Sequence, residues 1–240
     1  MKFIDQLKEK AKQNKKTIVL PETSDMRTIE AAGKVLAEGI ANIILVGDKE
    51  DIMSRAGDID LSGASFVDPK NYEKFDEYVD AFVEMRRKKG MTEARAKELL
   101  LTNPLYFGCM MVKQDDADGM VAGAINASAD VLRAALQTLK TAPGTRIVSA
   151  FFLVVVPDCQ YGANGTFVFA DAGLNQSPSA SELADIAEQS AKSFELLVDE
   201  TPVVAMLSHS TKGSAKHPDV DKVIEATEIV NAEFPDLLCD

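Results

Sequence analysis

Short apolar runs alternate with longer amphipathic segments from the beginning of the chain. Residues 17–20, 42–46 and 64–67 are predicted to be strands, because each is a short apolar run bounded by turn residues. Residues 25–39 and 49–56 lie between these runs and repeat apolar side chains at helical spacing. Such alternation is typical of parallel sheets, in which a crossover helix joins consecutive strands. The sequence therefore predicts an α/β fold.

The same pattern continues to the last residues. Further helices are predicted at 3–11, 72–89, 91–101, 103–113, 131–139, 179–198 and 220–234. Further strands are predicted at 119–122, 147–156, 166–170 and 202–207. The run 147–156 is expected to be buried, and the turn Gly162–Gly165 predicts that it forms a hairpin with 166–170. Turn residues from Pro143 to Arg146 place a domain boundary there, which gives predicted α/β domains at 1–145 and 146–240.

The charge balance excludes several classes of function. Of the 240 residues, 46% are hydrophobic and 27% are charged, as in an ordinary globular protein. The formal net charge of −12 and the lack of a large Lys/Arg cluster argue against nucleic-acid binding. The longest apolar run, 150–157, is shorter than the roughly 20 residues that span a bilayer. The first residues contain no apolar signal region, and Cys109, Cys159 and Cys239 have neither metal nor disulfide spacing. We therefore expect a cytoplasmic protein without nucleic-acid or membrane partners.

One stretch, Asp118–Gly144, combines a strand, a glycine-bearing turn and a helix. Gly119 and Gly123 allow the backbone to come close to a ligand as the strand ends. The following helix has small polar residues that are able to cap it, namely Asn126, Ser128 and Asp130. Because the first N–H groups of a helix have no partner within it, we expect this end to hold an anion.

Two arginines occupy opening turns of helices, where the helix dipole disfavours a cation. Arg133 is explained either by an anionic ligand or by an ion pair with Asp130, and the sequence leaves both open. For Arg27, a salt bridge to Glu22 or Asp25 is the simpler explanation.

A second polar loop follows the predicted strand 202–207. It contains Ser208, Ser210, Thr211, Lys212, Gly213 and Ser214. Hydroxyl, N–H and ammonium donors together suit phosphate oxygens, although the residue order is not that of a Walker A loop. A solvated turn in which Ser214 caps the next helix is the alternative, and it also stays open. Because α/β sheets bind ligands at the carboxyl ends of their strands, we expect this loop and the Asp118–Gly144 stretch to serve one site.

Other candidate residues have plainer explanations. Arg86 and Arg87 end a helix, where cations complement its dipole. No residues near His209 and His217 in the sequence have the spacing of a metal site or would complete a catalytic triad. Cys159 follows a strand and is either a reactive thiol or a buried small hydrophobic residue.

Four motifs together resemble the phosphate acetyltransferase family. They are LPE followed by Asp25 and Arg27, then DGMVAGAINASADVLRAALQTLKTAPG, ADAGLNQSPSASELADIA and MLSHSTKGSAKHPDVDKV, and the similarity begins at Ile18. The resemblance implies reversible conversion of acetyl-CoA and phosphate into acetyl phosphate and coenzyme A, with no cofactor and no metal. It also implies two α/β lobes of the isocitrate/isopropylmalate dehydrogenase type, with the active cleft between them, in a homodimer.

Carried over residue by residue, the resemblance assigns substrate binding to two groups of residues. They are Arg87, Ser128 and Arg133, and the loop residues Ser210, Thr211, Lys212, Gly213 and Ser214. Arg87 and Arg133 match arginines that bind anionic substrate, Ser128 lies in the turn associated with the acyl phosphate, and Cys159 lies near the cleft without being the nucleophile. Phosphate would attack the thioester carbonyl directly while cationic and N–H donors stabilise the oxyanion.

Two features depart from the family pattern. His209 stands where relatives have an aromatic residue, which we interpret as a packing change. Family members also continue beyond the position of Asp240. The resemblance places in that segment the aspartate that takes the coenzyme A thiol proton and an adjacent Ser-Arg pair. We therefore expect no catalytic residue within this sequence and no turnover by the polypeptide alone.

Two related functions remain as alternatives to the acetyltransferase. Phosphate butyryltransferase uses the same chemistry, and related domains of malic enzymes bind acetyl-CoA as regulators without catalysis. A nicotinamide-dependent oxidoreductase is disfavoured because the G-x-G-x-x-G fingerprint is absent.

Overall fold

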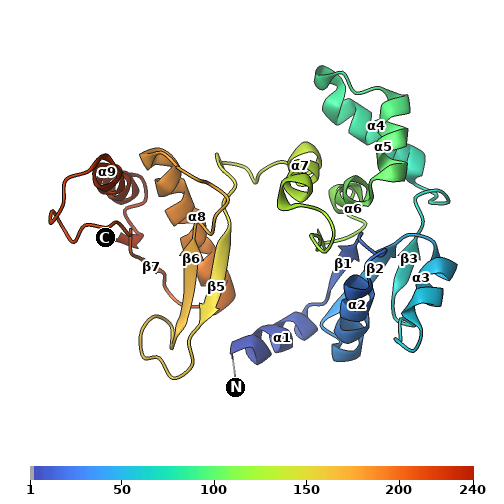
Figure 1. The fold of residues 1–240 in the computed structure, drawn as a ribbon, viewed down its shortest axis with the longest axis horizontal. Coiled ribbons are helices and arrows are strands. Elements are labelled where there is room, and N and C mark those ends of the chain that lie inside the picture. The colour runs from blue at the N-terminus through green and yellow to red at the C-terminus, as the bar shows by residue number, and fades with distance from the viewer. Residues whose placement is uncertain (1–2) are drawn as a thin grey trace. The chain divides into compact units, whose positions relative to one another are not determined.

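The computed structural model describes residues 3–240, and the chain divides into two compact units between Lys140 and Thr141. The sequence places its boundary after residue 145. The first unit contains a four-stranded parallel sheet, and the second contains an antiparallel pair of strands and a short parallel pair (Figure 1). The predicted α/β class and the hairpin are confirmed. None of the helices within residues 3–240 is long and apolar enough to cross a membrane.

Four parallel strands of the first unit stand in the order β3-β2-β1-β4. They are β1 (Lys16–Leu20), β2 (Ala41–Val46), β3 (Ser65–Val67) and β4 (Gly119–Met120). The helices are α1 (Phe3–Gln13), α2 (Met26–Glu38), α3 (Lys49–Ala56), α4 (Phe75–Arg86), α5 (Glu93–Thr102), α6 (Pro104–Lys113) and α7 (Ser128–Thr138), with a 3-10 turn, η1 (Arg87–Lys89), after α4. β4 is shorter than the predicted strand 119–122, because the backbone after Val121 leaves the sheet to bind the side chain of Glu22.

The two central strands of this sheet have a separate hydrophobic core on each face, since successive side chains of a strand point to opposite faces. Val19, Ile44 and Val46 pack with the buried residues of α4 to α7. Leu20, Ile43 and Leu45 pack with α2 and α3. Helices therefore cover both faces of the sheet, as parallel strands require.

Local sequence signals explain where several of these helices begin and end. Asp25 caps α2 by accepting a hydrogen bond from the Arg27 N–H, and Gly39 ends the helix in the left-handed conformation with φ 66°. Asn103 ends α5 and caps α6 through its side chain. Every residue of α6 from Leu105 to Met111 is buried, which makes this helix the centre of one core.

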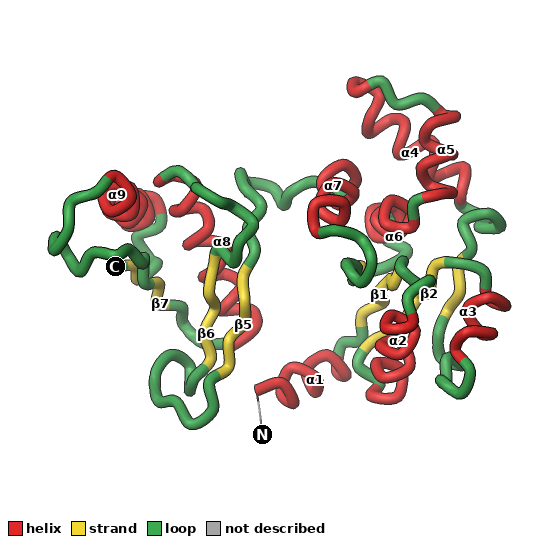
Figure 2. The backbone as a smooth tube through the Cα atoms, in the orientation of Figure 1, coloured by secondary structure: helices red, strands yellow, loops and turns green. Residues whose placement is uncertain are grey.

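The second unit is built around two helices. Its elements are β5 (Phe151–Val155), β6 (Thr166–Ala170), α8 (Ala180–Val198), β7 (Val203–Val204), α9 (Pro218–Glu233) and β8 (Leu238–Cys239). Helix α8 packs on α9 and on β6, and the β5–β6 hairpin is seen in Figure 2. Ser179 and Glu182 form the predicted capping box at the start of α8.

Two strand predictions for the second unit are wrong in extent. β5 begins at Phe151 rather than near residue 147, and it is not buried, because Phe152 is 65% exposed. A two-stranded sheet leaves its side chains far more accessible than the predicted interior strand would. β7 covers only Val203–Val204 of the predicted 202–207, because its parallel partner β8 is equally short.

Candidate functional site

Each unit presents one of the two loops that the sequence selects, and each loop follows the carboxyl end of a strand. In the first unit, this is the segment Gly123–Ala127 between β4 and α7. In the second unit, it is the segment Ser208–Lys216 between β7 and α9.

The loop after β4 already binds an anion, and that anion belongs to the protein. Glu22 Oε2 accepts hydrogen bonds from the backbone N–H groups of Gly123 and Ala124, both at 2.6 Å. Glu22 Oε1 accepts from the N–H groups of Ile125 at 3.1 Å and Asn126 at 2.8 Å, and from the Asn126 side chain at 2.8 Å. We call residues 123–126 the Glu22-binding loop. The amides of residues 123–126 are therefore occupied, whereas the anion predicted at the first N–H groups of the helix, which begins at Ser128, stays a prediction.

These hydrogen bonds decide the charge state of Glu22. Only 3% of the residue is exposed, and burial alone would raise the pKa of its carboxyl group. The hydrogen bonds from Asn126, Ala124 and Ile125 outweigh burial and lower the pKa of Glu22 to about 2. The side chain is therefore a carboxylate at neutral pH.

Arg27 holds the same loop from its carbonyl side. Its Nη2 lies 2.8 Å from Asp25 Oδ2, so of the two acids proposed for it, Asp25 is the one that pairs. The same nitrogen donates to the Ala124 carbonyl at 2.5 Å. Arg27 thus links the start of α2 to the Glu22-binding loop.

Helix α7 begins without a side-chain cap. Its N-cap residue is Ala127, so the predicted capping by Asn126, Ser128 or Asp130 is wrong. Asn126 instead uses its side chain to bind Glu22, and Ser128 is the exposed first residue of the helix. Arg133 Nη1 lies 2.5 Å from Asp130 Oδ1, which is the ion-pair alternative, and the arginine side chain is 56% exposed.

The arginines at the end of α4 differ from each other in a way that the sequence did not reveal. The Arg87 side chain is 76% exposed and pairs with Glu84 at 3.4 Å. Arg86 turns inward, and among the described residues its buried Nε has no hydrogen-bond partner. Burial raises the pKa of Tyr106 on α6, and the charges of Arg133 and Arg86 both oppose that increase. The signal for Arg86 was its position in the apolar stripe of α4, four residues after the buried Phe82.

In the second unit, several polar groups of the Ser208–Lys216 loop bind one another. Ser214 Oγ accepts from the Thr211 N–H at 2.8 Å, and Ser210 Oγ accepts from the Ala215 N–H at 3.1 Å. Lys212 has φ 37° and Gly213 has φ 83°, so the tip is left-handed. Lys212 Nζ pairs with Asp240 Oδ1 at 2.9 Å, and both side chains are 79% exposed.

Ser214 does not cap the following helix, contrary to the alternative considered for it. His217 is the N-cap of α9, and its Nδ1 accepts from the Asp219 N–H at 3.2 Å. The His209 ring packs edge-on against His217, with centroids 5.5 Å apart. The two histidine rings therefore pack against each other, one near each end of the loop.

The cysteines are free thiols in the described chain. Cys159 is partly exposed in the turn between β5 and β6, with Sγ 3.9 Å from the Tyr161 carbonyl oxygen, so the buried alternative for it is wrong. Burial raises the pKa of Cys109 to about 12, which keeps that thiol protonated. Residues 3–240 contain no group of three acidic, histidine or cysteine side chains that could hold a metal ion.

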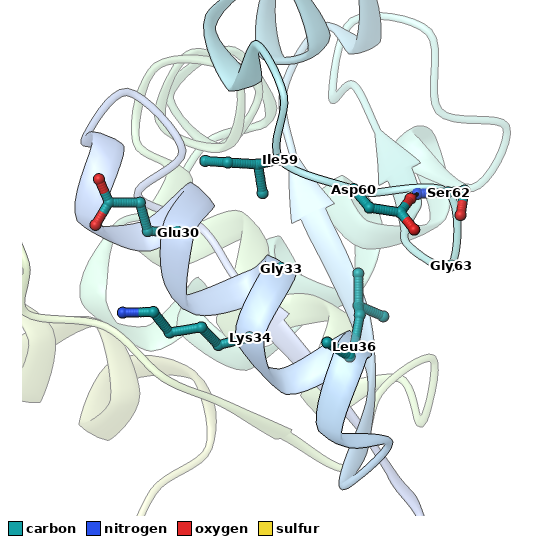
Figure 3. Close-up of a pocket in the computed structure, with 9 residues that line it drawn as sticks. Glu30, Gly33, Lys34, Leu36, Ile59, Asp60, Ser62 and Gly63 are labelled. Carbon is teal, nitrogen blue, oxygen red and sulfur yellow. Dashed lines mark hydrogen bonds between the residues drawn. The ribbon is translucent and has the colours of Figure 1, made fainter.

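The hollows of the two units lie away from the predicted site residues. A cavity of about 510 Å³ lies between α2 and the segment 59–63 (Figure 3). It is lined by Glu30, Gly33, Lys34, Leu36, Ala37, Ile59, Asp60, Ser62 and Gly63. A second cavity, of about 360 Å³ in the second unit, lies beside Arg146 and Asp185, which form an ion pair at 2.6 Å. Neither cavity includes Ser128, Arg133 or the Ser208–Lys216 loop.

Comparison with known proteins gives concordant matches over the whole chain. A family model described as "Phosphate acetyl/butaryl transferase" matches residues 2–240. A phosphate acetyltransferase of Acetivibrio thermocellus is 52% identical over 240 residues, which are all of this chain and 72% of the relative. Another, of Thermoanaerobacterium thermosaccharolyticum, is 53% identical and is covered to 73% of its length.

Solved structures agree with the sequence matches. A phosphotransacetylase from Streptococcus pyogenes superposes with a TM-score of 0.89 at 40% identity, over 99% of this chain and 71% of that chain. The EutD phosphotransacetylase from Staphylococcus aureus gives a TM-score of 0.88 at 37% identity, over the same shares. The chain belongs to the phosphate acetyl/butyryl transferase family.

Proposed function

We propose that this chain serves the reversible transfer of an acetyl group between coenzyme A and inorganic phosphate. The observation that carries the proposal is the identity of 52% and 53%, over the full length of the chain, to two relatives named phosphate acetyltransferase. Coenzyme A is then a substrate, and the reaction needs no further cofactor.

The proposed reaction is a direct displacement at the thioester carbonyl. A phosphate oxygen bonds to the carbonyl carbon and the carbon–sulfur bond breaks. The departing thiolate takes up the proton that the attacking hydrogen phosphate loses, and becomes the free thiol of coenzyme A. Such a reaction gains most from holding the two anionic substrates together and from stabilising the oxyanion that forms between them.

The residues proposed for substrate binding are cationic or rich in hydrogen-bond donors. They are Arg87, Ser128 and Arg133 in the first unit and Ser210, Thr211, Lys212, Gly213 and Ser214 in the second, with Cys159 placed near the reaction cleft. In a chain of net charge −12, a few local cations must supply the attraction for the anions. The ion pairs Arg133–Asp130 and Lys212–Asp240 are solvent-exposed, so exchanging the carboxylate for a substrate anion costs little.

The proposed setting of this site is the cleft of two lobes of the isocitrate/isopropylmalate dehydrogenase type, in a cytoplasmic homodimer. Free cysteines in the described chain support a reducing compartment. Sedimentation of the purified chain tests the dimer, and a concentration-independent monomer would contradict it.

Coenzyme A binding and turnover, measured on the same polypeptide, test the proposed function. We expect saturable heat on titration with coenzyme A, abolished in an Arg133→Ala, Lys212→Ala double variant that stays folded. Thiol release from acetyl-CoA in the presence of phosphate is the assay of turnover. Robust release would confirm the reaction and contradict the expectation that this polypeptide is inactive alone, whereas failure to bind coenzyme A would contradict the proposal.

The same assays separate the acetyltransferase from its alternatives. The family description includes butyryl transfer, so acetyl and butyryl phosphate should be compared as donors to coenzyme A. We expect acetyl phosphate to be preferred, because the relatives that match along the whole chain bear the acetyl name. Tight acetyl-CoA binding without chemistry in a longer chain carrying this sequence would favour a regulatory binding domain.

A further inference from the structure

Glu22 belongs to the LPE motif that marks this chain, yet none of the binding roles proposed above uses it. It lies two residues after the end of β1 and is only 3% exposed. A carboxylate is costly to bury unless hydrogen bonds replace its lost water. Glu22 meets this condition with five donors, four of which are backbone N–H groups of residues 123–126.

The contact joins the carboxyl ends of two neighbouring strands. β1 and β4 are parallel neighbours, with Ile18 opposite Gly119 and Val19 opposite Met120. Glu22 follows the first strand and the Glu22-binding loop follows the second, so the carboxylate spans the place where both chains leave the sheet. Gly123, at φ 111°, lets the loop turn its successive N–H groups toward one point.

The loop has little freedom left once these contacts form. Glu22 takes its N–H groups, and Arg27 donates to its Ala124 carbonyl oxygen. Ala127 is the N-cap residue of α7, so the helix starts two residues after Asn126, the last residue whose backbone amide Glu22 binds. The positions of Ser128 and Arg133 therefore depend on a segment that is fixed by a buried carboxylate.

The same contacts make the loop amides unavailable to a substrate phosphate. A substrate phosphate would have to displace a charged group that is tethered to the sheet and holds every amide from Gly123 to Asn126. A tethered group competes at a high effective concentration. The substrate anion must therefore rely on other hydrogen-bond donors. The Glu22-binding loop supports the site without binding the substrate.

We propose that Glu22 is a positioning residue, whose carboxylate presets the Glu22-binding loop and thereby places Ser128 and Arg133 for the anionic substrate. The placement of the loop follows from the structure of the chain alone. The effect on ligand affinity rests on the proposed function, with coenzyme A as the ligand.

Amide hydrogen exchange and calorimetry on the full chain test this proposal in Glu22→Gln. The glutamine side chain has only one acceptor oxygen, so it cannot accept hydrogen bonds from all the N–H groups. Its NH2 group is a donor and would face the N–H donors of the loop. We expect exchange at 123–126 to rise about tenfold or more, and coenzyme A affinity to fall by at least about tenfold, which corresponds to about 1.4 kcal/mol. Exchange within β2 should change less. Exchange at 123–126 equal to that of the wild type would overturn the proposal.

The matched control is Asp116→Asn, which alters another mostly buried carboxylate of the same unit. Asp116 accepts hydrogen bonds from Tyr72, Lys74 and Tyr78, none of which belongs to the Glu22-binding loop. This control should lose stability while coenzyme A affinity of the folded protein stays within about twofold of wild type, because distant sites act independently. An equal loss of affinity in both variants would assign Glu22 a merely structural role and overturn the proposal.

Two further variants extend the test, and the milder one, Asn126→Ala, covers the case in which Glu22→Gln does not fold. Asn126→Ala removes one of the five donors and should change exchange and affinity in the same direction by a smaller factor. In Glu22→Ala, formate supplies a free carboxylate to the amides, and we expect it to restore slow exchange and coenzyme A affinity together. Recovery of exchange without affinity would overturn the link to the ligand, and no recovery of exchange would overturn the loop as a carboxylate site.

Should the wild-type chain bind no coenzyme A, the proposed function fails while the exchange measurements still decide the structural half of the proposal. Fast exchange at 123–126 in Glu22→Gln would then support the positioning of the loop, and unchanged exchange would overturn it.

Discussion

The Glu22-binding loop of the first unit and the Ser208–Lys216 loop of the second both follow a strand and are both closed by backbone N–H groups. They differ in what accepts those hydrogen bonds. In the first unit, the acceptor is a buried carboxylate from a neighbouring strand end. In the second unit, Ser210 and Ser214 accept from within the loop itself, and both the loop and its ion pair with Asp240 are largely exposed.

This difference separates a preformed scaffold from an adaptable loop. A loop held by a distant buried group keeps its shape as long as the sheet is intact, whereas exposed local hydrogen bonds exchange readily with water or with a ligand. The first unit is therefore suited to fixing geometry. The second loop, with Lys212 free to leave an exposed partner, is suited to closing around an anion.

The largest loss of stability is expected from Glu22→Ala. Its removal leaves four part-buried backbone N–H groups without their acceptor, and we expect the first unit to lose on the order of 4 kcal/mol of unfolding free energy. Ser214→Ala, which removes an acceptor in the exposed loop, should cost about 1 kcal/mol or less. Urea unfolding followed by residue-resolved hydrogen exchange measures both units separately. Similar costs for the two variants would show that the loops do not differ in this way.

Acid provides the next largest effect. The pKa of Glu22 is lowered from 4.5 to about 2 in the folded protein, so its stabilisation is present above pH 4.5 and is lost as the pH falls from 4.5 toward 2. The full loss is about 3 kcal/mol, because one pKa unit corresponds to about 1.36 kcal/mol. Exchange at 123–126, corrected for its intrinsic pH dependence, should therefore accelerate across this interval. Glu22→Gln, which has no titrating group there, is the control and should show no such transition.

Local rules predicted much of the fold from the sequence. The helical repeat and the caps at Asp25 and Gly39 gave α2, and the Ser179–Glu182 pair gave the start of α8. These signals can be recognised in the sequence because the hydrogen-bonding groups of a helix cap lie within a few residues of each other. The four quoted motifs also gave the family.

Contacts between distant residues could not be predicted in this way. The Glu22 carboxylate binds amides that lie 101 to 104 residues away in the sequence, so no local sequence pattern predicts this contact. The pairing of β7 with β8 and the inward turn of Arg86 are also tertiary outcomes. The substrate-binding role predicted for the polar residues after β4 stays a prediction, whereas the amides of residues 123–126 bind a carboxylate of the protein itself.

A smaller loss of stability is expected at a second carboxylate of the first unit. Asp116 accepts hydrogen bonds from two tyrosines and a lysine, and the hydrogen bonds from Lys74, Tyr78 and Tyr72 hold its pKa below the ordinary value although burial opposes this. Tyr78→Phe keeps the aromatic contacts with Tyr72 and Phe107 and removes one donor. We expect a loss of about 1 to 2 kcal/mol in unfolding free energy and a higher Asp116 pKa.

Urea unfolding and the acid titration of Tyr78→Phe provide the measurement. If the first unit depends on buried carboxylates in general, this variant should lose less stability than wild type on acidification, because its Asp116 pKa lies closer to the unfolded value. Exchange at 123–126 in the folded state should stay as in wild type. Accelerated exchange of that loop would instead show that the whole unit loosens together, and the special role of Glu22 would be lost.

The smallest stability effect is expected from Lys212→Gln. The Lys212–Asp240 pair is 79% exposed on both sides, and such pairs contribute little, so unfolding free energy should change by less than about 0.5 kcal/mol. If the loop closes around an anion, coenzyme A or phosphate should nevertheless bind at least about tenfold more weakly, because a charge-assisted contact that forms only with ligand is removed. Calorimetry at low and high salt measures this loss, which should shrink as salt screens the charge. A stability loss comparable to that of Tyr78→Phe would mean that Lys212 is held by the fold rather than available to a ligand, and the contrast between a rigid first loop and an adaptable second one would fail.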